Sequence, residues 1–248
     1  MGCYSPCEKA EPGAKLLPML DLSGREAVVT GGTGALGRAV VGRLVAAGAT
    51  VHVPVFAAEE LEAFPYREHH AVRLHEGLDL SAEADVARLF GATSSLYASI
   101  QVAGGFAMGP IASTGLDVWE HLMRMNATTC FLSCREAVKA MDGREGRIVN
   151  VTARPVLVPT ALMTAYAASK AAVAALTLSL AEELSESSIW VNAIVPSIID
   201  TEANRAAMPD ADYAAWPKPE EIAETVAFLA SPQNTATRGA LVPVYGKS

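Results

Sequence analysis

Short apolar runs alternate with longer segments of helical spacing along most of the chain. Runs rich in valine, isoleucine and alanine predict strands, and apolar residues three and four positions apart predict the helices between them. The predicted strands are 27–30, 50–55, 71–74, 96–102, 147–151, 190–195 and 240–245. The predicted helices are 38–47, 82–90, 119–141, 165–183 and 219–230.

This alternation predicts one fold class. Strands that alternate with helices of this length form a parallel sheet with helices on both faces. We therefore predict an α/β fold with a doubly wound parallel sheet of about seven strands. No linker-like stretch divides residues 21–248, which we interpret as one domain, and residues 1–20 are rich in proline, glycine and charge, which predicts a flexible extension.

Composition excludes several function classes. The chain has 248 residues, of which 51% are hydrophobic, so it can bury a sizeable core. Its net charge of −8 argues against a nucleic acid or an anionic membrane as partner. The apolar stretch Ala171–Ala181 lies between Lys170 and Glu182 and is too short to span a bilayer. Without a signal-peptide pattern, we expect a cytoplasmic protein.

The cysteines do not suggest a metal site. Cys130 and Cys134 lie one helical turn apart on an apolar stretch and fit small buried side chains. A metal would need further His, Asp or Glu ligands at suitable spacing, and none is present. We therefore predict no metal.

A glycine turn follows the first predicted strand. The sequence "TGGTGALG" lies between that strand and a helix. Such a turn brings backbone N–H groups and a helix N-terminus to one point, where a diphosphate binds. The sequence therefore predicts a nucleotide site, with cofactor contacts from Gly31, Thr33, Gly34, Leu36 and Gly37.

The choice between NAD and NADP stays open. An acid at the end of the second strand would bond the ribose hydroxyls, and a base would accept the extra phosphate. Val55 and Phe56 stand there and do neither. Asp79, in "GLDLS", could accept from an adenine amino group or could be a turn residue in front of a helix near Ser81.

Tyr166 and Lys170 are candidate catalytic residues. They stand at positions i and i+4 of a predicted helix and so share one face. A nearby ammonium group stabilises phenolate and lowers the pKa of a tyrosine, which can then exchange a proton with a substrate. A surface pair without function is the alternative, and the upstream glycine turn favours the catalytic interpretation.

Together these segments resemble the short-chain dehydrogenase/reductase family from Leu20 to Gly246. The motifs that carry the resemblance are "TGGTGALG", "LDL" with Asp79, "VAGG" at 102–105, "MNATT" with Asn126, "YAASK" with Tyr166 and Lys170, and "NAIVPSIIDT" at 192–201. The resemblance implies a single Rossmann-fold domain and transfer of the pro-S hydride to or from the nicotinamide of NAD or NADP. It also implies a homodimer or homotetramer through the helix that contains residues 128–141.

The resemblance also implies residue roles. Tyr166 would be the acid/base, Lys170 would hold the nicotinamide ribose and tune Tyr166, and Asn126 would hold a water in the proton relay. Beyond the glycine turn and Lys170, the implied cofactor contacts are Asp79, Leu80, Ala103, Gly104, Pro196, Ile199 and Thr201.

Three positions depart from the family pattern. Gln101–Val102 replaces paired asparagines, and Ser197 replaces a glycine after Pro196. Ala153 replaces the serine that donates a hydrogen bond to the substrate oxygen, and alanine cannot donate. Losing one such donor costs about 10²–10³ in rate. Thr152 is adjacent, but successive residues at a strand end point to opposite sides.

Dihydropteridine reductases are the branch that this chain resembles at these positions. They carry alanine at the same offset, share "VAGG", and have a segment similar to 201–216. In that segment Trp216 could close over a planar substrate ring as part of a lid, or the segment could be a packed surface loop.

Three functions remain open on this basis. The first is an NAD(P)H-dependent reductase of a small molecule with an activated, conjugated C=N or C=O group. The second is an ordinary carbonyl reductase or alcohol dehydrogenase in which Thr152 or a water replaces the serine. The third is a nucleotide-binding sensor or scaffold that has lost turnover.

Overall fold

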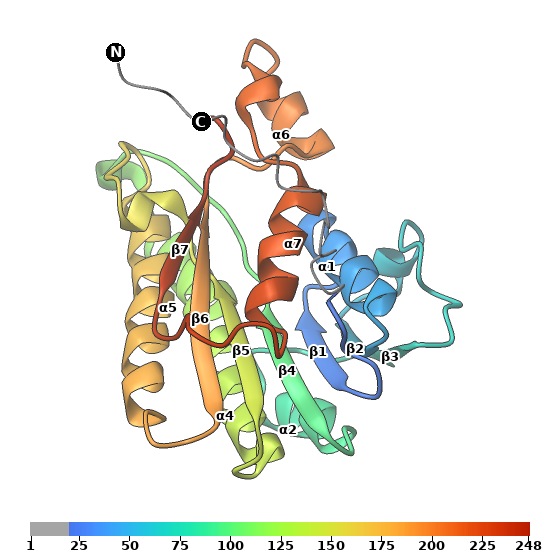
Figure 1. Ribbon diagram of the computed structural model, residues 1–248. Coiled ribbons are helices and arrows are strands. Elements are labelled where there is room, and N and C mark those ends of the chain that lie inside the picture. Colours follow the sequence, from blue (N-terminus) through green and yellow to red (C-terminus); the bar gives the residue numbers. More distant parts are fainter. Residues whose placement is uncertain (1–19) are drawn as a thin grey trace, which may run out of the picture.

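The computed structural model describes residues 20–248 and contains one seven-stranded parallel sheet (Figure 1). The strand order is β3-β2-β1-β4-β5-β6-β7, so the chain winds outward in both directions from β1 and β4. This confirms the predicted doubly wound α/β sheet. The strands are β1 (Glu26–Thr30), β2 (Thr50–Val55), β3 (Val72–Glu76), β4 (Leu96–Gln101), β5 (Gly146–Val151), β6 (Ile189–Pro196) and β7 (Leu241–Val244).

Helices connect the strands as predicted, with two differences. The α-helices are α1 (Ala35–Ala46), α2 (Glu83–Gly91), α3 (Leu116–Leu122), α4 (Thr129–Met141), α5 (Thr164–Glu183), α6 (Glu202–Ala207) and α7 (Pro219–Leu229). Short 3₁₀ turns cover Ala58–Leu61 (η1), Ile111–Ser113 (η2), Arg154–Val156 (η4) and Tyr213–Ala215 (η5). The predicted helix 119–141 is interrupted by a π-helical turn, η3 (Met123–Thr128), and α6 lies in a segment with no predicted helix.

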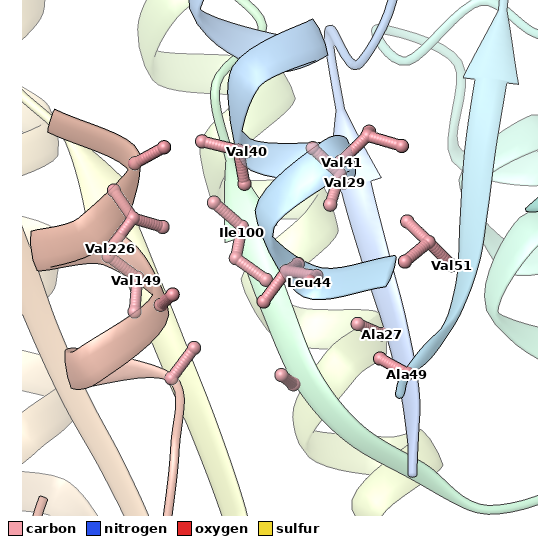
Figure 2. Packing of buried hydrophobic residues seen from close by; sticks show 14 of the residues in the cluster. Ala27, Val29, Val40, Val41, Leu44, Ala49, Val51, Ile100, Val149 and Val226 are labelled. Carbon is pink, nitrogen blue, oxygen red and sulfur yellow. The ribbon is translucent and has the colours of Figure 1, made fainter. Parts of the chain in front are cut away.

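Two hydrophobic cores fill the two faces of the sheet. α1 and α7 cover one face, where Val40, Leu44 and Val226 pack on strand residues such as Ile100 (Figure 2). α2, α4 and α5 cover the other face. Strand β1 shows the alternation directly, because Val29 belongs to the first core and Val28 to the second. Both faces are therefore buried, as the continuous apolar runs of the strands predict.

The predicted N-terminal extension lies almost wholly outside the described residues, which begin at Leu20. Leu20 itself was predicted to be flexible but is partly buried against the first core. Cys130 and Cys134 are buried in the second core with their sulfurs 4.0 Å apart. The Sγ of Cys134 also donates to Asn150 Oδ1 at 3.4 Å. Both cysteines are therefore small buried side chains, as the sequence predicted.

α5 corrects the sequence argument about membranes. The helix has 20 residues and is long and apolar enough, by length and composition alone, to cross a bilayer. The stretch between Lys170 and Glu182 is therefore shorter than the apolar helix to which it belongs, which is Thr164–Glu183. In the structure α5 packs on the sheet through residues such as Val173 and Ala181, as a core helix does.

His52 on β2 and His75 on the neighbouring strand β3 stack their imidazole rings. His52 is 5% exposed, and its Nδ1 lies 3.0 Å from His75 Nε2. The carboxylate of Glu26 lies 3.8 Å from His52 Nε2, but it already accepts hydrogen bonds from Ser94 and Ser95. Burial, followed by the neighbouring His75, lowers the pKa of His52 despite Glu26, and burial lowers the pKa of His75.

This pair predicts that the protein loses stability in mild acid. The unfolded histidines take up protons near pH 6.5, whereas the folded pair resists protonation, so the free energy of unfolding falls as the pH drops through that value. Urea unfolding between pH 5 and 8 should show this slope, and His52→Leu should flatten it. The exposed His70→Gln is the control and should keep the slope. An unchanged slope in His52→Leu would contradict this assignment.

Candidate active site

The glycine turn packs directly on the end of β4. Gly31 has φ +63°, and a Cβ there would lie 2.7 Å from the backbone nitrogen of Ala103. A Cβ on Gly37 would overlap the carbonyl oxygen of Gly31. Only glycine fits at either position, so the turn and α1 are held at the point where the chain reverses its winding direction. Ligands of open α/β sheets bind at this switch point.

The start of α1 offers an anion site at the same place. Gly34 is the N-cap of α1 and contributes no side-chain cap, so the first N–H groups keep their capacity for another acceptor. A Cβ on Gly34 would meet nothing closer than 3.4 Å, which leaves room in front of the helix. The turn therefore fits a dinucleotide diphosphate. The Leu36 side chain is buried in the first core, so a cofactor contact from this residue would come from its backbone.

Thr30 and Gln101 support this turn from below. The Thr30 hydroxyl donates to Gln101 Oε1 at 3.2 Å and accepts from the backbone N–H of Ala103 at 3.3 Å. Gln101 Nε2 donates to Ser99 Oγ at 2.6 Å. Gln101 thus joins β1 to β4, and the departure from paired asparagines still leaves the ends of these two strands tied together.

Asp79 forms a turn in front of α2. Its Oδ1 accepts from both the backbone N–H and the hydroxyl of Ser81, each at 2.8 Å. This is the turn role that the sequence left open beside adenine recognition, and only Oδ2 remains for another donor. The next residue, Leu80, is partly buried against the second core.

Asn126 clamps three segments together. The π-helical turn η3 carries it, and π turns often mark functional sites. Its Nδ2 donates to Gly105 O and to Ser169 Oγ, both at 3.0 Å, and its Oδ1 accepts from Gly105 N at 2.9 Å. Ser169 in turn donates to the carbonyl of Tyr166 at 2.8 Å. Both amide hydrogens are used, so the side chain acts as a clamp, and a water held by Asn126 would have to donate to one of its oxygens.

Lys170 points into the site from the same helix. Its Nζ donates to Val151 O, at the end of β5, at 2.9 Å. A Cβ on Gly104 would lie 3.2 Å from this Nζ and 2.5 Å from Asn126 Oδ1, so the end of β4 lies against both side chains. Burial lowers the pKa of Lys170 to about 8. The fold therefore brings together Lys170, Asn126 and Gly104, three of the predicted site residues.

The predicted lowering of the tyrosine pKa is wrong for this state of the protein. Burial raises the pKa of Tyr166 to about 12. The Lys170 ammonium is directed to the Val151 carbonyl and does not offset the loss of water around the phenol. Tyr166 is therefore a neutral phenol that can donate a proton.

Thr152 is not a substitute for the missing serine. Its hydroxyl is buried and donates to Ile194 O on the neighbouring strand at 2.9 Å. This hydrogen bond uses the only hydrogen of the hydroxyl, so in this state Thr152 cannot donate to a substrate oxygen. Ala153 is 5% exposed and extended, with φ −158° and ψ 153°. The end of β5 thus offers no side-chain hydroxyl in the serine position.

Phe106 covers Tyr166, and sequence reasoning missed it. The two rings pack edge to face with centroids 4.9 Å apart, and Phe106 stays 58% exposed. Its loop is joined to the segment in front of α5 by a hydrogen bond from Gly109 N to Leu162 O. These two segments carry six exposed apolar side chains, which we call the apolar collar: Phe106, Met108, Ile111, Leu157, Val158 and Leu162.

Residues after β6 hold α6 in place. The Thr201 hydroxyl caps α6 by accepting from Asn204 N, and Ile199 O accepts from Asn204 Nδ2 at 2.8 Å. Ser197, which follows the buried Pro196, donates to Tyr245 O at 3.1 Å. Ser197 is thereby tied to the C-terminal segment, and Ile199 and Thr201 gain a structural role beside the implied nicotinamide contact.

Trp216 belongs to a packed loop and not to a free lid. It is 8% exposed, and its ring lies 5.1 Å from that of Tyr213. The hydroxyl of Tyr213 donates to Met208 O at 3.0 Å, and Lys247 N donates to Ala215 O at 2.9 Å. The loop is thus packed, as in the second of the two alternatives, and contact of Trp216 with substrate stays a prediction.

A groove of about 1120 Å³ lies elsewhere, between α1, α6 and α7. Its lining includes Arg38, Tyr66, Glu202 and Glu224, but neither Tyr166 nor Lys170. We do not assign the chemistry to this groove, because no acid/base pair of the kind described above faces it. Among residues 20–248 no cluster of three or more potential metal ligands is present either.

Comparison with known proteins decides the family. The family model of the short chain dehydrogenases matches residues 25–212. The chain belongs to the short-chain dehydrogenase family. It is therefore an oxidoreductase, and members of this family use NAD or NADP. The match is to the family as a whole, and the similarity to dihydropteridine reductases remains a prediction.

Individual relatives agree with this assignment. The chain is 31% identical to a 3-alpha-(or 20-beta)-hydroxysteroid dehydrogenase of Mycobacterium bovis, across 91% of this chain and 89% of the relative. It is 29% identical to the 3beta-hydroxysteroid dehydrogenase 1 of Eggerthella lenta, across 91% and 94%. A solved short-chain type dehydrogenase/reductase from Mycobacterium ulcerans superposes with a TM-score of 0.85 at 25% identity, across 92% and 90%.

The close packing of the glycine turn predicts a sharp effect of one methyl group. Gly37→Ala should destabilise the protein by about 1–3 kcal/mol, because its Cβ must displace the Gly31 carbonyl. It should also weaken nucleotide binding. Gly91→Ala is the control, since nothing lies within 4 Å of its Cβ at the end of α2. Urea unfolding and a nucleotide titration measure both effects, and equal stability of the two variants would contradict the packing described.

Proposed function

We propose that this oxidoreductase transfers a hydride from a nicotinamide dinucleotide to an activated, conjugated C=O or C=N group of a flat, largely apolar ring. The observation that carries the proposal is the absence of a hydroxyl donor at the end of β5. Ala153 has none, and the hydroxyl of Thr152 is bound to Ile194 O. A substrate with low intrinsic reactivity would need that donor, whereas a conjugated, electron-poor ring depends on it less.

The dinucleotide site is supported by the turn and the helix start. Gly31 and Gly37 permit the close backbone approach, and the uncapped N-terminus of α1 at Gly34 attracts the diphosphate. When bound there, the cofactor supplies the hydride. Lys170, which lies against Gly104, would hold the nicotinamide ribose next to Tyr166.

Tyr166 supplies the proton that accompanies the hydride. With a pKa of about 12 the phenol is neutral at physiological pH, so its Oη can donate to the oxygen or nitrogen that gains negative charge. Lys170, with a pKa of about 8, carries a positive charge in most molecules at pH 7. A cation near the phenol would favour the phenolate left after proton transfer.

The apolar collar supports a large apolar substrate. Phe106 contacts the Tyr166 ring, Leu162 lies on the segment bonded to the Phe106 loop, and both side chains are about half exposed. An exposed apolar surface of this kind around a polar site fits a ring system with one reactive group. Two bacterial relatives carry hydroxysteroid names, and steroids belong to this class of large apolar rings.

Those names favour a second candidate, the interconversion of a hydroxyl and a ketone on an apolar ring. The apolar collar would fit such a substrate equally well. However, the Thr152 hydroxyl already donates to Ile194 O, so it cannot replace the donor that the serine would supply. A bound water would have to take that place. A protein without turnover is a third possibility, and the Asn126 clamp, which holds the Tyr166 and Lys170 helix to β4, argues against it.

Turnover should depend on the activated group and on Tyr166. With NADH or NADPH, kcat/KM for a naphthoquinone or a quinonoid dihydropterin should exceed that for a saturated ring ketone of similar size by at least about 10²-fold. Tyr166→Phe should lower turnover by about 10²–10⁴ and leave nucleotide binding nearly intact. Tyr213→Phe is the control. Faster turnover of the saturated ketone would favour the second candidate, and tight nucleotide binding without any turnover would favour the third.

Restoring the missing hydroxyl should broaden the substrate range. The extended backbone at residue 153 accepts any L-residue, so Ala153→Ser should fold normally. Its hydroxyl should raise kcat/KM for the saturated ketone by about 10²–10³ and change that for the conjugated ring much less. Steady-state kinetics on both substrates give the ratio. A ratio that does not change would show that residue 153 does not face the reacting group.

A further inference from the structure

We infer that Glu60 makes the nucleotide site selective for NADH over NADPH. This inference rests on the proposed function, because it needs a dinucleotide at the glycine turn. Val55 and Phe56 left the choice between NADH and NADPH open. Glu60 would make that choice from the 3₁₀ turn η1, which follows β2.

Two hydrogen bonds fix the Glu60 carboxylate beside the glycine turn. Oε2 accepts from the hydroxyl of Thr33 at 2.6 Å, and Oε1 accepts from the backbone N–H of Ala57 at 3.2 Å. Glu60 is partly buried, whereas its neighbour Glu59 is exposed. The carboxylate is therefore held in one place, although Glu60 is far from the turn in sequence.

That place is where the adenosine ribose should lie. Thr33 belongs to the turn that would hold the diphosphate, and β2 is the parallel neighbour of β1. In folds of this kind the ribose next to the diphosphate lies over the end of the second strand, and an acid there accepts from its hydroxyls. Glu60 would be this acid. It lies in η1, after the end of β2, and its carboxylate contacts Thr33 of the glycine turn.

The charge of Glu60 is not neutralised within the described part of the chain. No arginine, lysine or histidine nitrogen lies within 4 Å of its carboxylate there. The basic residue after the turn, Arg38, donates to Ala63 O at 3.0 Å and lines the groove beside α7. A ribose phosphate at this point would therefore meet a carboxylate without a paired cation, and like charges repel.

An exposed aromatic residue stands between the end of β2 and Glu60 in the sequence. Phe56 follows β2 and is 68% exposed, which is unusual for so large an apolar side chain. The end of β2 is joined to the segment before α2 by a hydrogen bond from Leu78 N to Val55 O. A flat aromatic ring at this edge offers a stacking surface to a nucleoside base.

The test is a binding titration of the full chain with NADH and, separately, with NADPH. Wild type should bind NADH at least about tenfold more tightly. Glu60→Gln keeps the size of the side chain and removes its charge, so it should reduce this ratio severalfold or more, mainly by tightening NADPH. Glu59→Gln lies in the same turn, is exposed, and should keep the wild-type ratio.

Phe56→Arg gives an independent check if Glu60→Gln does not fold. It places a cation at an exposed position directly after β2 and should also shift the ratio toward NADPH. Equal binding of both cofactors by wild type, or a ratio that Glu60→Gln leaves unchanged, would overturn the inference. Failure of both cofactors to bind would instead contradict the proposed function, and the inference with it.

Discussion

The hydrogen bonds of the Asn126 side chain are the interaction on which the site depends. They join the π-helical turn, the backbone of Gly105 after β4, and Ser169 on α5. α5 carries Tyr166 and Lys170, and the end of β4 lies against the glycine turn through Ala103. One buried amide therefore fixes the distance between the region that would bind the nucleotide and the residues that would move the proton.

The rest of the site follows from burial. Lys170 is buried, and its ammonium is satisfied by one backbone carbonyl, that of Val151. Tyr166 is buried, with Phe106 packed against its ring, and burial raises the pKa of its phenol, which therefore stays protonated. In the free protein Tyr166 is therefore a neutral phenol that can donate a proton, and Lys170 is mostly charged at pH 7 with its ammonium bound to the Val151 carbonyl. With no hydroxyl at Ala153, the end of β5 offers no side-chain donor there, and the proposed activated substrate rests on this.

The sequence predicted what local patterns determine. The strands, the glycine turn and the Tyr166–Lys170 pair were found because each depends on residues close together in the chain. The commitment of Thr152 to Ile194, the burial of Trp216 and the position of Glu60 depend on contacts between distant segments. The π turn was missed because a helical pattern of apolar residues does not reveal one extra residue in a turn. A glutamate after β2 was a visible signal for Glu60, but only the fold brings it to Thr33.

We expect nucleotide binding and chemistry to meet at the glycine turn, the end of β4 and the start of α5. Hydrogen–deuterium exchange of the protein with and without NADH measures whether they do. Exchange should be slower at residues 31–37, at 103–105 and around Tyr166 when NADH is present. Protection confined to the groove between α1, α6 and α7, with no change at the glycine turn, would contradict it.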